Sequence, residues 1–134
     1  MANSWYDLGL QGVGDQSIAM LTDDIRIALV TAGYTRNLAT DQFVSDVGGG
    51  NIVARSTALQ TKSFTGGVFN AANITIVGVS GSVVTQAVIY KYNASDSLAR
   101  LIMSIDTGTG LPLTPNGGDV PVTWSAGATK IGKL

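Results

Sequence analysis

The residues best suited to chemistry are aspartates, and the sharpest pattern among them is Asp106-Thr-Gly108. This triplet follows the apolar run Leu101–Ile105, as the catalytic loop of an aspartic protease follows a strand, and two such loops must pair so that two carboxylates share a proton. A single copy would require a homodimer. The residues that follow, through Pro115, do not supply the flap and second strand pair of such an enzyme. We therefore interpret Asp106 as a strand-end turn residue and predict that the protein is not an enzyme.

Two further patterns raise the question of a bound ion. Asp106, Asn116 and Asp119 could converge on a calcium ion, because hard cations take carboxylate and amide oxygens, but their spacing matches no known calcium loop. The run Gly48-Gly-Gly50 lacks the Lys-Ser/Thr pair and the following helix of a phosphate-binding loop. We predict turns at both places and no cofactor, and leave open whether a metal sits near Asp106 and Asp119.

Missing residue types exclude several classes of chemistry. The 134 residues include no histidine and no cysteine, which removes Cys/His zinc sites, disulfides and Ser-His-Asp triads. Net charge is −1 and the basic residues are scattered singly, so no basic stripe is available for nucleic acid. No apolar run reaches the ~20 residues that span a membrane, and the N-terminus does not resemble a signal peptide. We expect a protein made in a reducing cytoplasm.

Residues 1–20 differ from the rest of the chain. Their apolar side chains, Trp5, Tyr6, Leu8 and Leu10, are interrupted by glycines, each of which costs a helix ~1 kcal/mol. We predict an N-terminal arm with at most a short helical turn. Aromatic anchors on a flexible end suit an interface, so these four residues are candidate partner contacts. The alternative, that Trp5 and Tyr6 fold onto their own core, stays open.

Residues 21–134 read as one β domain. Apolar residues alternate with period two in about seven short segments, and turn residues recur every 8–12 positions, which is typical of a β-sandwich or small barrel. One short helix is expected near Asp41–Val47, capped by Thr40 and ended by the three glycines. The core residues predicted from the alternation are Ile27, Leu29, Phe43, Ile76, Val88, Tyr90, Leu101, Met103 and Trp124.

Several stretches resemble a family of small tailed-bacteriophage virion proteins. They are Leu21–Val30, Leu38–Val47, Gly67–Thr75, Ala87–Lys91 and Leu101–Gly118, and together they cover most of the chain. Members of this family look like capsid decoration, or cement, proteins. The resemblance implies a jelly-roll-like β-sandwich on the outer shell, often a dimer or trimer, that bridges capsomers. The Gly-rich segment Gly9–Gly14 departs from the family pattern, where more helix is expected.

Taken together, these observations predict an all-β protein: a jelly-roll-like or immunoglobulin-like β-sandwich with one short helix and an N-terminal arm. The expected function is to decorate and stabilise the outer surface of a tailed-phage icosahedral capsid. The expected partners are the major capsid protein and further copies of this chain, with no direct contact to nucleic acid or membrane. The protein would be assembled in the host cytoplasm and reside in the virion. Two alternatives remain: a tail- or fibre-associated virion module, and a carbohydrate-binding β-sandwich using Tyr90, Tyr92 and Trp124.

Overall fold

The computed structural model describes residues 3–105, 111–124 and 132–133, and these form antiparallel sheets with one α-helix. The main sheet has five strands in the order β1-β8-β7-β2-β3. Its strands are β1 (Asn3–Trp5), β8 (Arg100–Ile105), β7 (Gln86–Lys91), β2 (Ile25–Val30) and β3 (Ile52–Arg55). The β-rich fold expected from the alternating sequence is confirmed.

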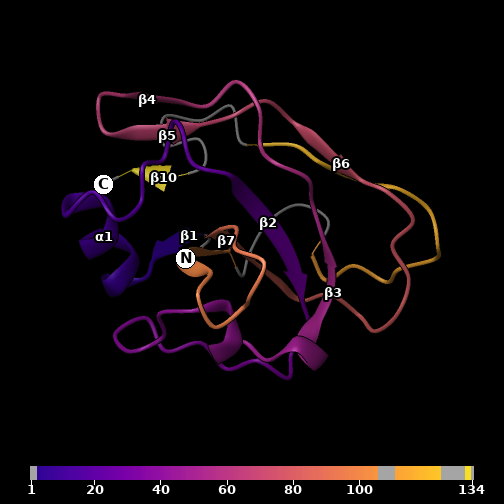
Figure 1. Ribbon diagram of the computed structural model, residues 1–134. Coiled ribbons are helices and arrows are strands. Elements are labelled where there is room, and N and C mark those ends of the chain that lie inside the picture. Colours follow the sequence, from indigo (N-terminus) through magenta and orange to yellow (C-terminus); the bar gives the residue numbers. More distant parts are fainter. Residues whose placement is uncertain (1–2, 106–110, 125–131, 134) are drawn as a thin grey trace.

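Two smaller sheets accompany the main sheet. One has the order β10-β5-β4 and the other pairs β6 with β9. Their strands are β4 (Ser63–Thr65), β5 (Val68–Asn70), β6 (Ile74–Ile76), β9 (Val120–Val122) and β10 (Gly132–Lys133). In Figure 1, β4, β5 and β6 lie along the top of the molecule, β2 runs through the middle, and residues 34–51 lie below.

The central strands of the main sheet are buried on both faces. Along β2, Ile27 and Leu29 point into one apolar cluster while Ala28 and Val30 point into a second, because successive side chains of a strand face opposite ways. The first cluster is completed by residues of the smaller sheets, such as Phe69 and Ile76, and the second by residues 34–47. Both faces of β2 are therefore covered, although alternation in its sequence is typical of a strand that is buried on one face only.

Most of the predicted core is confirmed, with two exceptions. The buried members are Ile27, Leu29, Ile76, Val88, Tyr90, Leu101 and Met103. Phe43 is only partly buried, and the guanidinium of Arg100 lies 6.0 Å from its ring centroid. Trp124 is also partly buried, packs against the first cluster, and donates a hydrogen bond from its Nε1 to the carbonyl of Ala72 at 3.0 Å.

The helix expected near Asp41–Val47 is absent. This segment contains only a 3₁₀ turn at Val44–Asp46, and a second such turn follows at Gly49–Asn51. Backbone N–H and carbonyl groups that a local helix would pair with each other are bonded instead to a distant part of the chain. Val44 N–H donates to the carbonyl of Ala99, and Leu101 N–H donates to the carbonyl of Gln42, both at 2.8 Å. The Asp46 carboxylate also accepts the N–H of Gln42 at 2.9 Å. Pairing with the start of β8 therefore replaces local helix formation.

The α-helix lies instead in the N-terminal segment, as α1 (Asp7–Gly14), directly after the edge strand β1. The glycines that argued against a helix have a packing role here, since Gly9 and Gly12 are buried. A Cβ on Gly9 would lie 2.7 Å from the carbonyl oxygen of Leu101 and 2.9 Å from the Cα of Ile102. Close contact between α1 and β8 offsets the poor intrinsic helix propensity. Residues 3–20 are thus part of the main sheet and its cover rather than a separate arm.

This packing predicts opposite effects for alanine at two glycines of the same helix. Gly9→Ala should lower the free energy of unfolding by ~1–3 kcal/mol, because its methyl group meets backbone that cannot rotate away. Gly14→Ala is the matched control, since a Cβ there meets nothing within 4 Å. It should be neutral or stabilising by ~0.5–1 kcal/mol, as expected when Ala replaces Gly in a helix. Urea unfolding of both variants tests this, and equal effects would contradict it.

Candidate interaction surfaces

The predicted chemical residues do not form a catalytic or metal centre in the part of the chain that the structure describes. Asp106 lies outside the described residues. Asp119 accepts a hydrogen bond from Gly78 N–H at 3.1 Å, and Asn116 accepts one from Gly118 N–H at 2.9 Å. Within residues 3–105, 111–124 and 132–133, no three acidic side chains gather closely enough to hold a metal ion. Asn116 and Asp119 therefore stabilise loop backbone.

Over the same described ranges, no helix has the length and apolar character needed to cross a membrane.

Of the four candidate contacts near the N-terminus, Tyr6 is fully buried and so cannot contact a partner in the folded chain. Trp5 pairs with Met103 across the β1–β8 ladder and packs against the first cluster. Leu8 is half-buried and its carbonyl accepts a hydrogen bond from Arg100 Nη2 at 2.8 Å. Of the four, only Leu10 is exposed. For Tyr6, the alternative of packing onto its own core is the correct one.

Tyr6 belongs to a buried chain of hydrogen bonds that joins the N-terminus to the cover of the second cluster. The Tyr34 hydroxyl donates to Asp41 Oδ2 at 2.6 Å, so Tyr6 is the donor in the 2.7 Å contact between the two phenols. Asp41 also accepts the backbone N–H of Asn37 at 2.8 Å. Burial raises the pKa of Tyr34, and the hydrogen bond to Asp41 raises it further. Burial likewise raises the pKa of Tyr6.

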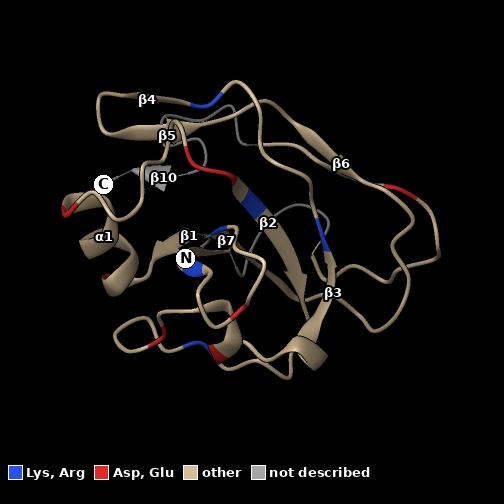
Figure 2. Cartoon of the chain, in the orientation of Figure 1, with Lys and Arg blue, Asp and Glu red and all other residues tan. Residues whose placement is uncertain are grey.

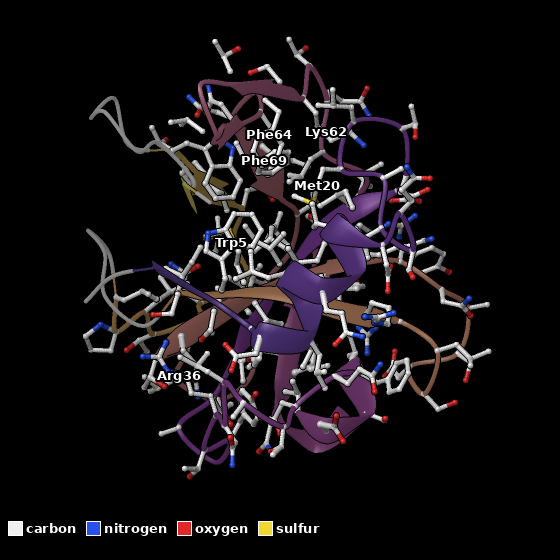
Figure 3. The ribbon with its side chains drawn as sticks, turned by 90° about the vertical axis from the view of Figure 1, so that its left-hand side faces the viewer. Trp5, Met20, Arg36, Lys62, Phe64 and Phe69 are labelled. Carbon is white, nitrogen blue, oxygen red and sulfur yellow. The ribbon has the colours of Figure 1, made fainter. Side chains whose placement is uncertain are left out.

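A shallow apolar depression lies beside the C-terminal end of α1. Its volume is about 540 Å³, and Figure 3 shows two of its lining residues, Met20 and Phe64, near one another. The full lining is Val13, Gln16, Ile18, Ala19, Met20, Leu21 and Phe64. No spacing in the sequence points to this depression, because Phe64 reaches it from β4, far along the chain from the other lining residues.

The most exposed large apolar side chain among the described residues lies on a double loop that we call the Val77 tip, residues 77–83 with 113–119. Val77 is 77% exposed, and Val83 of the same loop is also exposed. The two loops are held together by Val79, whose N–H donates to Gly118 O at 2.9 Å and whose carbonyl accepts Gly117 N–H at 2.7 Å. The only charged residue of the tip is Asp119. The tip therefore consists of two loops that are joined by backbone hydrogen bonds, carries almost no charge and exposes apolar side chains.

A second exposed region, which we call the paired-arginine surface, consists of Asp24, Arg26, Arg55, Tyr92 and Asp96. Arg26 Nε and Nη2 donate to the two Asp24 oxygens at 2.9 Å each. Arg55 Nη1 and Nη2 donate to the two Asp96 oxygens at 2.7 Å each. The hydrogen bonds from Arg55 hold the pKa of Asp96 below its usual value. Figure 2 shows basic segments in blue on the neighbouring strands β2 and β3.

The three aromatic residues suggested for carbohydrate binding do not form a common platform. Tyr90 is fully buried in the second cluster. Tyr92 is 38% exposed, and the Arg26 guanidinium covers its ring at 3.8 Å. Trp124 packs against the first cluster, on the other side of the main sheet. Stacking on a sugar ring requires coplanar exposed faces, which these three residues do not provide.

Comparison of the sequence with protein-family models and with curated proteins gives no match.

The buried tyrosine chain predicts a loss of stability at alkaline pH. The unfolded chain ionises its phenols near the ordinary pKa of 10.0, whereas the folded pKa of Tyr34 and of Tyr6 is raised. Their contribution is therefore fully present below pH 10 and is lost as pH rises above it. Tyr34→Phe should cost ~1–3 kcal/mol at neutral pH, because Asp41 and Tyr6 lose a partner, and should show a shallower alkaline decline.

Urea unfolding between neutral pH and the alkaline range measures both effects. Tyr92→Phe is the control, because it also removes a phenol hydroxyl but from a residue that is 38% exposed, and it should cost little stability at neutral pH. An unchanged alkaline decline in Tyr34→Phe would show that the buried chain does not control it.

Proposed function

We propose that this chain is a structural virion protein that decorates the outer surface of a tailed-phage icosahedral capsid and stabilises the shell. The proposal starts from the resemblance of Leu21–Val30, Leu38–Val47 and Leu101–Gly118 to capsid decoration proteins. It includes a jelly-roll-like or immunoglobulin-like sandwich, which is supported by the smaller sheets that supply part of the first core cluster on one face of the main sheet. Its partners are the major capsid protein and further copies of this chain.

The single observation that best supports a binding role is the Val77 tip. A valine that is 77% exposed is costly to leave in water, whereas burying it fully against a partner gains ~1.5–3 kcal/mol. The hydrogen bonds between the two loops keep the tip in one shape, so little conformational entropy is lost on binding. The near absence of charge fits contact with a protein surface. We assign the tip as the contact with the shell.

The mechanism of stabilisation is mass action. A protein that binds the assembled shell but not the separated capsomers stabilises the shell by RT ln(1 + [L]/Kd) at each site. Symmetry repeats the site many times, so modest gains add up across the particle. No step of this mechanism requires a catalytic group, a cofactor or a metal.

A tail or fibre location is the remaining virion alternative, and imaging distinguishes the two. Electron microscopy of particles carrying an antibody or gold label on this chain should place the label on the head. Labels confined to the tail would contradict the capsid assignment. The carbohydrate-binding alternative is weakened by the burial of Tyr90.

A co-sedimentation assay tests the shell contact. Wild-type protein should sediment with undecorated shells, and Val77→Asp should raise the dissociation constant at least ~10-fold, since a tenfold change corresponds to ~1.4 kcal/mol. Leu21→Asp is the matched control: it also replaces an exposed apolar residue by a charge, but outside the tip. Equal binding by Val77→Asp and wild type would refute the tip as the contact, and no binding by wild type would refute the capsid role.

A further inference from the structure

We propose that the paired-arginine surface is a self-association surface, on which a second copy of this chain sits across a two-fold axis. This inference rests on the self-association included in the proposed function, but it does not depend on attachment to a shell. It commits to a dimer rather than a trimer and names the residues that form the contact.

The two ion pairs are neighbours because both arginines flank one buried tyrosine. Tyr90 is paired with Arg26 in the β2–β7 ladder, and the Arg55 guanidinium carbon lies 5.9 Å from the Tyr90 ring centroid. Tyr90 itself is fully buried. The four charged side chains above it are 26–37% exposed. They therefore form one continuous, partly exposed surface rather than two separate pairs.

This surface is organised before any partner arrives. Both guanidinium groups are held in bidentate contacts with carboxylates, and the ring of Tyr92 is held beneath Arg26. Each bidentate contact uses two of the five N–H groups of an arginine, so Arg26 keeps donors for a partner. Residues fixed in this way lose little rotamer freedom on binding. Arg and Tyr are also enriched among the residues that dominate interface energies.

The loop that carries Asp96 also presents an apolar side chain. Leu98 is 61% exposed, although it lies between Asp96 and the fully buried Ala99. The loop is fixed by a hydrogen bond from Ser45 N–H to the Asp96 carbonyl at 3.1 Å and by one from Val44 N–H to the Ala99 carbonyl at 2.8 Å. An exposed leucine on an anchored loop is suited to burial against a partner.

The charge pattern identifies the occupant as a second copy. The surface carries two positive and two negative groups, so its net charge is zero and it offers no attraction to a polyanion such as nucleic acid. A two-fold axis presents the same patch from both sides, so that arginine donors of one copy can face aspartate acceptors of the other. Like charges need not meet in this arrangement. The patch is complementary to itself, which gives a closed dimer.

The test measures the mass of the full chain by light scattering over a concentration series, in low and in high salt. Wild type should be a dimer at low salt and should dissociate more readily at high salt, because partly exposed charges are screened. Leu98→Ser should raise the dimer dissociation constant at least ~10-fold, because each copy loses an apolar side chain that the dimer buries. Tyr92→Ser should act in the same direction. Melting temperatures close to wild type confirm that each variant is folded.

The control is Val77→Ser, which removes an even more exposed apolar side chain outside this surface and should leave the dimer intact. A wild-type monomer at concentrations up to ~1 mM would overturn the inference, since weaker association has no role at ordinary concentrations. A dimer that resists Leu98→Ser and Tyr92→Ser, or a trimer, would also overturn it. The same variants are assayed for shell binding. If wild type is a monomer and Leu98→Ser loses shell binding, this surface contacts the shell instead and the inference is overturned. If wild type does not bind shells, only the capsid role is refuted and the dimer result stands.

Discussion

Burial of both faces of the β7–β2 ladder is the constraint on which the rest of the structure depends. Residues Gln86–Tyr90 of β7 are all buried, so apolar side chains leave this strand on both sides and each side needs a cover. The smaller sheets provide one cover through Phe69 and Ile76, and residues 34–47 provide the other through Val44 and Val47. The segment 34–47, which has little regular structure, is therefore part of the core packing and does more than connect strands. It excludes water from the second face.

Covering the second face with a segment of little regular structure requires its polar groups to be satisfied by other means. The Tyr6–Tyr34–Asp41 chain, the backbone pairing of Val44 with Ala99 and the hydrogen bond from Ser45 N–H to the Asp96 carbonyl do this. Each links residues that are far apart in the sequence, so the N-terminus, the cover and the β7–β8 loop depend on one another. Residues 3–14 are therefore held to the rest of the domain by the β1–β8 ladder and by the Tyr6 hydroxyl.

The few charges also shape the surfaces that remain for partners. In the described chain, the paired-arginine surface is held by internal ion pairs, and the Val77 tip is nearly uncharged. Exposed ion pairs of this kind add little to folding stability, so their main physical effect is to hold side chains in one geometry. Two surfaces with different chemistry on one small domain suit a protein that contacts both its own copy and another protein.

Alternation of apolar residues by itself determined the β-rich fold and most of the core, because the side-chain period is a local property of a strand. Interior residues found in this way include Ile27, Val88, Tyr90 and Met103. Composition determined that histidine and cysteine chemistry is excluded. Tertiary structure alone decided where the helix forms: Gly9 permits close contact of α1 with β8, and pairing of Val44 with Ala99 prevents a helix near Asp41. It also decided which residues meet at the surface, since Arg26, Arg55 and Asp96 lie on different segments. Local sequence carries propensity, but the backbone hydrogen bonds and close contacts that overrule propensity join residues many positions apart, and only the folded chain brings them together.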